Sequence, residues 1–198
     1  MELRVGRLAA SPLAMLIWAV FCLWLGLEAT LMLLICAAVH EAGHLLAIWA
    51  LGGRVKQVRA RLLGAVIRIE RMPYLREALA SAAGPAASML FALLMARKTG
   101  TGTFHLLAGS SAALGVFNLL PAYPMDGGRV LYALLAHRFG CEAASRVLLI
   151  TGYASTACMA AGGIALLRSP AGWALLISAA AMAIHYCKNG RFGLESIG

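Results

Sequence analysis

The 198-residue sequence is short of charge. Only 13% of its residues are Asp, Glu, Lys or Arg, whereas 62% are hydrophobic. Soluble domains have roughly a quarter charged and about half apolar residues, so this composition excludes a water-soluble globule. The sequence also lacks a CxxC pair, and its five cysteines are scattered, all but Cys141 in apolar stretches. Neither a disulfide scaffold nor a zinc finger fits that pattern.

Long apolar stretches take the place of charge. A helix needs about 20 apolar residues to cross a bilayer, and six stretches cross or nearly cross by that measure. They lie at 8–27, 29–51, 78–96, 103–120, 147–167 and 171–187. Between the second and third, β-branched runs within 52–74 predict a short β-hairpin on the membrane surface; a basic loop that only fixes topology is the alternative. We therefore expect an all-α polytopic membrane protein with about six transmembrane helices, folded as one domain over 1–198.

The basic residues orient these spans. With a cytoplasmic N-terminus, 14 of the 17 Lys and Arg residues fall on cytoplasmic segments and three fall outside. This excess follows the positive-inside rule. It also explains the net charge of +9 without a nucleic-acid partner. We expect a multi-pass protein of the cell membrane, in contact with the lipid bilayer, whose N- and C-termini are both cytoplasmic.

The second span contains three ionisable residues in an otherwise apolar stretch: His40, Glu41 and His44. An ionisable side chain inside a span costs at least about 2.5–3.5 kcal/mol, so three of them require a compensating partner. Residues i and i+4 share one face of a helix, so both imidazoles can bind one metal ion. HEAGH is an HExxH motif, in which the histidines bind zinc and the glutamate is a general base. A hydrogen-bonded cluster without metal is the alternative.

A third ligand is expected, because catalytic zinc usually has three protein ligands and one open position. Asp126 is the only aspartate in the chain, and it lies in the segment PAYPMDGG at 121–128. Proline and glycine predict that this segment is not helical. The topology above puts Asp126 and His44 at similar depth on the cytoplasmic side. The remaining histidines are weaker candidates. His105 lies at the opposite end of its span, and His137 and His185 are not part of a motif.

These residues resemble a known family. HEAGH in an early span, with NLLPAYPMDGG beginning at Asn118 in a later one, is similar to the site-2 proteases, which are intramembrane zinc metalloproteases. The match looks closest to the bacterial branch of stage IV sporulation protein FB. AAGPAAS at 82–88 resembles the family's small-residue motif, and we expect its Gly84, Pro85 and Ser88 to serve helix packing.

The resemblance implies a site and a reaction. One zinc ion per chain would be bound by His40, His44 and Asp126, with Glu41 catalytic. Asn118 would face the cleft and hold the substrate backbone, and the basic β segment would pair with the substrate. The alternative for Asn118 is a polar residue that bonds across helices.

The implied activity is regulated intramembrane proteolysis. An endopeptidase of this type would cleave a membrane-associated or transmembrane protein near the cytoplasmic leaflet, with its active site open to the cytoplasm. A sigma-factor precursor, as in sporulation, or an anti-sigma factor would be a substrate, and a membrane-embedded regulator a further partner. The sequence continues for eleven residues after the last span, so we expect neither a CBS nor a PDZ domain.

Two other functions are compatible with the residues alone. A divalent-metal transporter also places His and acidic residues in spans, although the outer halves of these spans hold almost no ligands. An inactive membrane scaffold is the second alternative. Metal stoichiometry combined with proteolysis of a substrate distinguishes the three.

The predicted orientation can be tested by thiol labelling. Single cysteines at Gln57 and Gly100, with the five native cysteines replaced, should label oppositely with a membrane-impermeant reagent. Gly100→Cys should react in intact cells and Gln57→Cys only after permeabilisation, because the basic segment is expected inside. Labelling of Gln57→Cys from outside would reverse the topology and move the chemistry to the outer leaflet.

Overall fold

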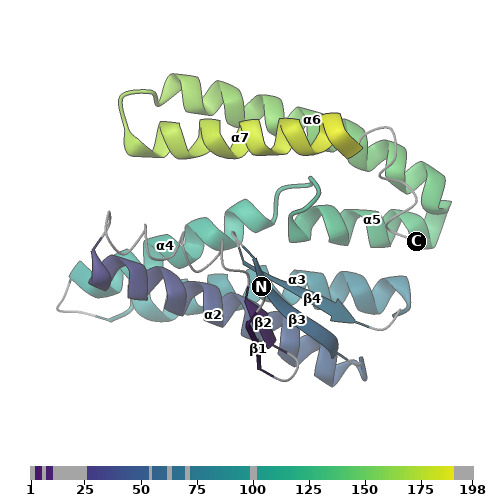
Figure 1. Ribbon diagram of the computed structural model, residues 1–198, viewed down its shortest axis with the longest axis horizontal. Helices are drawn as coiled ribbons and strands as arrows, with labels where there is room; N and C mark the ends of the chain where they lie inside the picture. Colours follow the sequence, from purple (N-terminus) through teal and green to yellow (C-terminus); the bar gives the residue numbers. More distant parts are fainter. Residues whose placement is uncertain are drawn as a thin grey trace. The chain divides into compact units, whose positions relative to one another are not determined.

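The computed structural model describes residues 3–5, 8–10, 26–53, 55–61, 64–69, 72–98 and 102–189. These residues fall into two compact units, one ending at Asn118 and the other beginning at Leu119 (Figure 1). The first unit combines helices with a small sheet. The second is helical throughout its regular elements.

Three helices form the body of the first unit: α2 (Leu27–Ala50), α3 (Tyr74–Ala96) and α4 (Gly102–Asn118). Each of them packs against the other two. Between α2 and α4 lies a small apolar core of Met32, Cys36 and Leu107, in which the Cys36 thiol is 3.7 Å from the Leu107 carbonyl oxygen. This three-helix packing fixes how α2 faces α3, and α2 carries the HEAGH motif.

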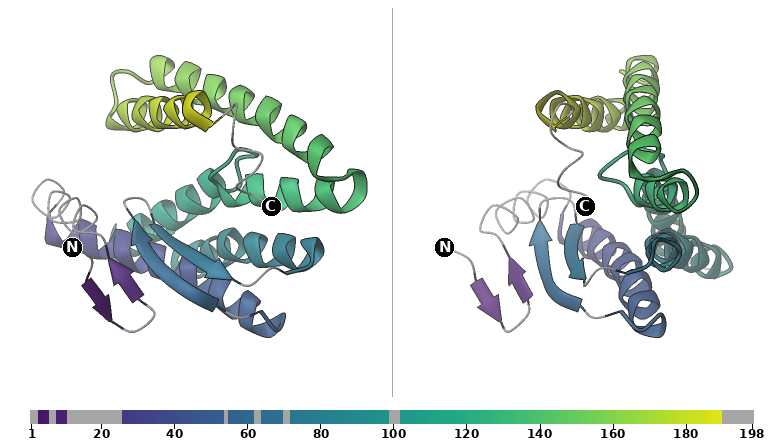
Figure 2. Two further views of the ribbon diagram at one scale, coloured as in Figure 1. Left: turned by 45° about the vertical axis from the view of Figure 1, so that its right-hand side comes forward. Right: turned by 90° about the vertical axis from the view of Figure 1, so that its right-hand side faces the viewer.

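A four-stranded sheet completes the first unit. Its strands β1 (Leu3–Val5), β2 (Leu8–Ala10), β3 (Val55–Arg61) and β4 (Gly64–Ile69) lie in the order β1-β2-β3-β4. The pairs β1/β2 and β3/β4 are antiparallel, whereas β2 and β3 are parallel. Strand β4 is at one edge of the described sheet and contacts α2 (Figure 2). The residues between β3 and β4 lie outside the described part of the chain.

The second unit contains α5 (Asp126–Phe139), α6 (Cys141–Ala165) and α7 (Pro170–Asn189). Helix α6 packs against both α5 and α7. Gly140 joins α5 to α6 with φ of +84°, a conformation that glycine adopts without steric cost. On α6, Gly152 leaves room for the Tyr186 ring of α7, because a Cβ at Gly152 would overlap the Tyr186 hydroxyl.

Two expectations from the sequence need correction. The first span was expected at 8–27, but Leu8–Ala10 is strand β2 and the next described helix begins at Leu27; residues 11–25 lie outside the described part. The segment 121–128 was expected to be irregular, yet α5 already begins at Asp126. The glycines at its start allow this, because a Cβ on Gly127 or Gly128 would overlap the backbone at 119–123.

Among the described helices, fewer qualify as membrane spans by length and composition than the sequence predicted. In the described residues, three helices are long and apolar enough to cross a membrane: α2, α3 and α6. A shorter apolar stretch, Gly172–Cys187, lies within α7. Helix α4 has 17 residues, against the 18 predicted at 103–120. The α5 helix, with its lower share of apolar residues, was not expected at all.

Candidate metal centre

Helix α2 presents the two histidines of HEAGH on its buried face. His40 and His44 are 5% and 7% exposed, and they belong to a buried row that begins at Met32 and ends at Ile48. Successive members of this row are four residues apart, which is the spacing of one helix face. Glu41 lies beside this row and is half-buried. The structure thus places the imidazoles as the i, i+4 spacing predicts.

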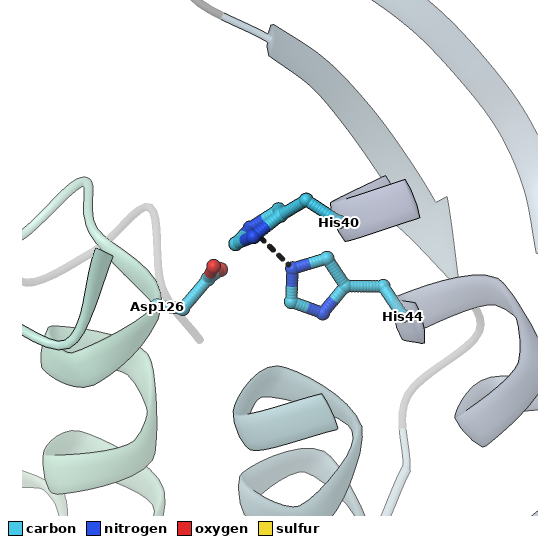
Figure 3. A group of neighbouring side chains, drawn as sticks. All are labelled: His40, His44 and Asp126. Atoms are coloured by element: carbon cyan, nitrogen blue, oxygen red, sulfur yellow. Dashed lines mark hydrogen bonds between the residues drawn. The ribbon is translucent and has the colours of Figure 1, made fainter. Parts of the chain in front are cut away.

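Helix α3 provides an oxygen partner for each imidazole. The Nδ1 of His40 is 2.9 Å from the hydroxyl of Ser88, and the Nδ1 of His44 is 2.8 Å from the carbonyl oxygen of Ala80. The two Nε2 atoms are 3.3 Å apart, and the rings meet edge to face (Figure 3). Partners on Nδ1 orient the rings, so that both Nε2 atoms point to one place.

This arrangement fits a metal ion. The Ala80 carbonyl can only accept a hydrogen bond, so His44 carries its proton on Nδ1 and has a lone pair on Nε2. Metal-ligating histidines usually donate their other N–H to a carbonyl, a carboxylate or water, which fixes the tautomer. Without metal, the 3.3 Å separation allows an N–H···N bond between the rings. When both rings are protonated on Nδ1, the two Nε2 lone pairs face each other, and a cation bound between them offsets their repulsion.

Glycines make the space for these rings. A Cβ on Gly84 of α3 would overlap the His44 ring at Nε2 and its neighbours. On α2, a Cβ at Gly43 would be 2.6 Å from the Ala83 carbonyl oxygen and 2.7 Å from the Ala87 Cβ. The two helices therefore approach so closely that neither position admits a side chain.

Asp126 is the first residue of α5 in the second unit and is 8% exposed. An acidic residue in the first turn is favoured by the helix dipole, by about 0.3–1 kcal/mol at a surface position. Among the residues that the structure describes, three buried side chains carry an imidazole or a carboxylate: His40, His44 and Asp126 (Figure 3). Burying ionisable groups is costly unless they are paired or bind metal.

The other polar candidates have different surroundings. His105 and His137 are exposed, in the first turn of α4 and the last turn of α5. The His185 ring contacts the rings of Tyr123 and Tyr186, at centroid distances of 5.3 and 5.9 Å.

Asn118 ends α4 and is partly buried. Its side-chain Nδ2 donates to the Leu114 carbonyl oxygen at 3.0 Å, one turn back in the same helix. The hydrogen bond that the structure shows for this side chain is thus local to α4. This bond uses one of the two N–H groups of the amide.

Sequence reasoning missed the partners on α3. Gly84 and Ser88 were assigned to helix packing, but both contact the histidines of the motif. The signal was present in their spacing, since residues 80, 84 and 88 recur every four positions and share a helix face. Only the packing of α3 on α2 shows that this face meets the histidines.

Comparison with known proteins agrees with the resemblance seen in the sequence. Residues 95–160 match the model of Peptidase family M50. The chain is 28% identical over 118 residues to a zinc metalloprotease of Methanocaldococcus jannaschii. The aligned residues make up 56% of this chain and 35% of that protein. It is 29% identical over 133 residues to stage IV sporulation protein FB of Bacillus subtilis, covering 63% of this chain and 46% of the relative.

A solved structure shares the fold. The site-2 protease of Methanocaldococcus jannaschii superposes with a TM-score of 0.68 at 20% identity, covering 92% of this chain and 91% of that one. The chain spans less than half the length of the curated relatives it matches. The predicted resemblance to the site-2 protease family is confirmed.

Gly84→Ala should weaken zinc binding, because its Cβ would occupy the space of the His44 ring. We expect the zinc dissociation constant, measured by competition with a chelator, to rise by at least about 10-fold, the lower end for disturbing the residues around a metal ligand.

Gly109→Ala is the matched control, since no atom lies within 4 Å of a Cβ there. It should keep zinc affinity and, as Gly→Ala in a helix, stabilise by up to about 1 kcal/mol. Unchanged affinity in Gly84→Ala would contradict the described ring position.

Proposed function

We propose that this chain is an intramembrane zinc endopeptidase. Its residues 95–160 match the model of Peptidase family M50, and it has the fold of a site-2 protease. One observation supports this most strongly. Two buried imidazoles on an apolar helix have their Nδ1 atoms engaged by α3, and their Nε2 atoms are 3.3 Å apart. A transporter would need further ligands along a path, and a scaffold would need no such pair.

The proposed ligand set is His40, His44 and Asp126, holding one zinc ion per chain. Two imidazole nitrogens and a carboxylate oxygen form a donor set typical of catalytic zinc, which keeps a fourth position open. All three residues are buried, so each carries a cost of burial that binding to a cation offsets. A zinc ion held there would act as a Lewis acid, which lowers the pKa of bound water and polarises a peptide carbonyl.

Glu41 is the proposed general base. Its carboxylate takes one proton from the water whose oxygen attacks the scissile carbonyl carbon. The protonated carboxyl then gives this proton to the departing amine nitrogen as the C–N bond breaks. Glu41 is next to His40 in sequence and half-buried, so it lies at the edge of the buried histidine face. The products are a carboxylic acid and an amine, and Glu41 is returned to its starting state.

The substrate must be extended before it is cut, because a helix hides its carbonyl groups in i→i−4 hydrogen bonds. We propose that the sheet pairs with the unwound segment on the cytoplasmic membrane surface. Strand β4 is at one edge of the described sheet and contacts α2, the helix with the histidines. Strand addition supplies main-chain hydrogen bonds regardless of substrate sequence. The Asn118 amide is proposed to hold another part of the substrate backbone, through its second N–H and its oxygen.

The proposed substrates are membrane-associated or membrane-spanning proteins cut near the cytoplasmic leaflet. A sigma-factor precursor or an anti-sigma factor is a substrate of the expected kind, and a membrane-embedded regulator is a proposed partner. One relative is named for a stage of sporulation. Both termini and the opening of the active site are proposed to face the cytoplasm, from the distribution of Lys and Arg.

Glu41→Gln tests the proposed chemistry. We expect cleavage to fall by about 100- to 10,000-fold, the contribution typical of a general base, because an amide cannot take the proton. Zinc should remain near one per chain by metal analysis. Cleavage is measured in liposomes on a membrane protein first captured by co-purification with this variant. Glu142→Gln is the matched control, since Glu142 is exposed and pairs with Arg146 on α6.

Two outcomes would contradict this assignment. Loss of zinc together with activity would make Glu41 a ligand instead of a base. Undiminished cleavage would show that Glu41 is not the general base, provided that Glu142→Gln cleaves like the natural sequence.

Asp126→Ala tests the third ligand. With only two imidazoles left, zinc affinity should fall by at least about 100-fold, more than changes around a ligand usually cause. Chelator competition measures this, with thermal unfolding of the metal-free protein as the check on folding. His137→Ala and His185→Ala should keep the affinity of the natural sequence. Full affinity in Asp126→Ala, with loss in either histidine variant, would assign the third ligand to that histidine.

A further inference from the structure

Ser88 lies where α3 meets the first histidine of the motif. Its side chain is 0% exposed, and its Oγ is 2.9 Å from the Nδ1 of His40, a residue 48 positions away in the sequence. No solvent competes for this contact, because both residues are buried. A buried hydroxyl that faces a proposed metal ligand is placed to influence how that ligand binds.

The backbone of Ser88 is itself held in place. The hydroxyl of Ser111 on α4 donates to the Ser88 carbonyl oxygen at 2.9 Å, and Ser111 is also 0% exposed. A Cβ on Gly115, one turn further along α4, would be 3.2 Å from the Ser88 Cβ. Helix α4 thus packs directly behind Ser88, which leaves the hydroxyl of Ser88 directed at His40.

The chemistry of the two groups defines what this contact does. A serine hydroxyl accepts and donates, so it can accept the N–H of a His40 ring protonated on Nδ1. In that tautomer Nε2 has a lone pair, and it lies 3.3 Å from the Nε2 of His44. A ring protonated on Nε2 would instead present a hydrogen to the place where the ion is proposed to bind.

We propose that Ser88 is a positioning residue for the metal centre. By accepting the Nδ1–H of His40, its hydroxyl fixes the tautomer and the orientation in which Nε2 binds the ion. Ala80 does the same for His44 through a backbone carbonyl, which no side-chain substitution removes. Ser88 therefore contributes a hydrogen bond to a histidine of the motif that a side-chain substitution can remove. This inference rests on the proposed zinc site, and it assigns to Ser88 a role beyond helix packing.

Two substitutions distinguish positioning from packing. Ser88→Ala removes the contact with His40 but leaves the backbone carbonyl that Ser111 bonds. Ser111→Ala removes the hydrogen bond between α4 and α3 but leaves the Ser88 hydroxyl on His40. The pair therefore separates the hydrogen bond to the ligand from the hydrogen bond between helices, at two serines of equal burial.

The full chain in lipid nanodiscs is titrated with zinc against a chromogenic chelator, and the metal-free forms are compared by thermal unfolding. We expect Ser88→Ala to raise the zinc dissociation constant by about 10- to 100-fold, as for other hydrogen-bond partners of metal-binding histidines. Ser111→Ala should lower Tm and keep the zinc affinity of the natural sequence. Equal affinity in Ser88→Ala and the natural sequence would overturn the inference and leave the proposed function intact. Absence of zinc binding by the natural sequence would overturn both.

A measurement on the natural sequence covers the case in which Ser88→Ala does not fold. Nitrogen-15 NMR of histidine-labelled, zinc-loaded protein distinguishes protonated from metal-bound ring nitrogens, and His→Gln variants assign the signals. We expect His40 to be protonated on Nδ1 and metal-bound through Nε2. The opposite tautomer would overturn the inference.

Discussion

The close contact between α2 and α3 is the constraint on which the candidate site depends. It exists because Gly43 and Gly84 have no side chain at the crossing, where a Cβ would overlap the opposite helix. At that separation the Ala80 carbonyl and the Ser88 hydroxyl reach the Nδ1 atoms of the two histidines. A wider spacing would break these two hydrogen bonds, and a buried polar group left unsatisfied costs about 1–3 kcal/mol. Helix packing and ligand orientation are therefore one feature of this structure.

The same helices show how a bilayer protein arranges its polar groups. On α2, the buried face carries Thr30, His40 and His44, whereas Leu46 and Trp49 are 64% and 79% exposed. Large apolar patches on a soluble monomer would be unusual, and they are expected where lipid covers the surface. Polar groups toward the helix contacts and apolar groups toward the outside satisfy both environments. The site is thereby built from the few polar side chains that the helix packing encloses.

Much of the fold and of the candidate site could be predicted from the sequence. The rest could not, because it depends on contacts between segments that are distant in the sequence. The i, i+4 pairing of His40 and His44 is local to one helix, so the motif alone predicted it. The contacts of Gly84 and Ser88 depend on which face of α3 meets α2, which no local pattern specifies. The start of α5 was missed because Gly127 and Gly128 indicate a turn by propensity, whereas in the fold they admit the preceding backbone. Strand β2 was missed since its residues begin an apolar run that also fits a helix.

Glycine has the same function in the two units, although the units differ in structure. In the first, Gly84 leaves the space that the His44 ring occupies. In the second, Gly127 and Gly128 let the segment 119–123 lie against the first turn of α5, the turn that begins with Asp126. An alanine at any of these positions would be a better helix former by about 1 kcal/mol, yet its Cβ would overlap neighbouring atoms. Each glycine thus lowers local helix stability and permits a close approach, and each adjoins a residue proposed to bind the metal. The positions where the chain departs from good helix propensity therefore mark the residues proposed for its chemistry, which is where conflict between local preference and tertiary structure is expected in a functional protein.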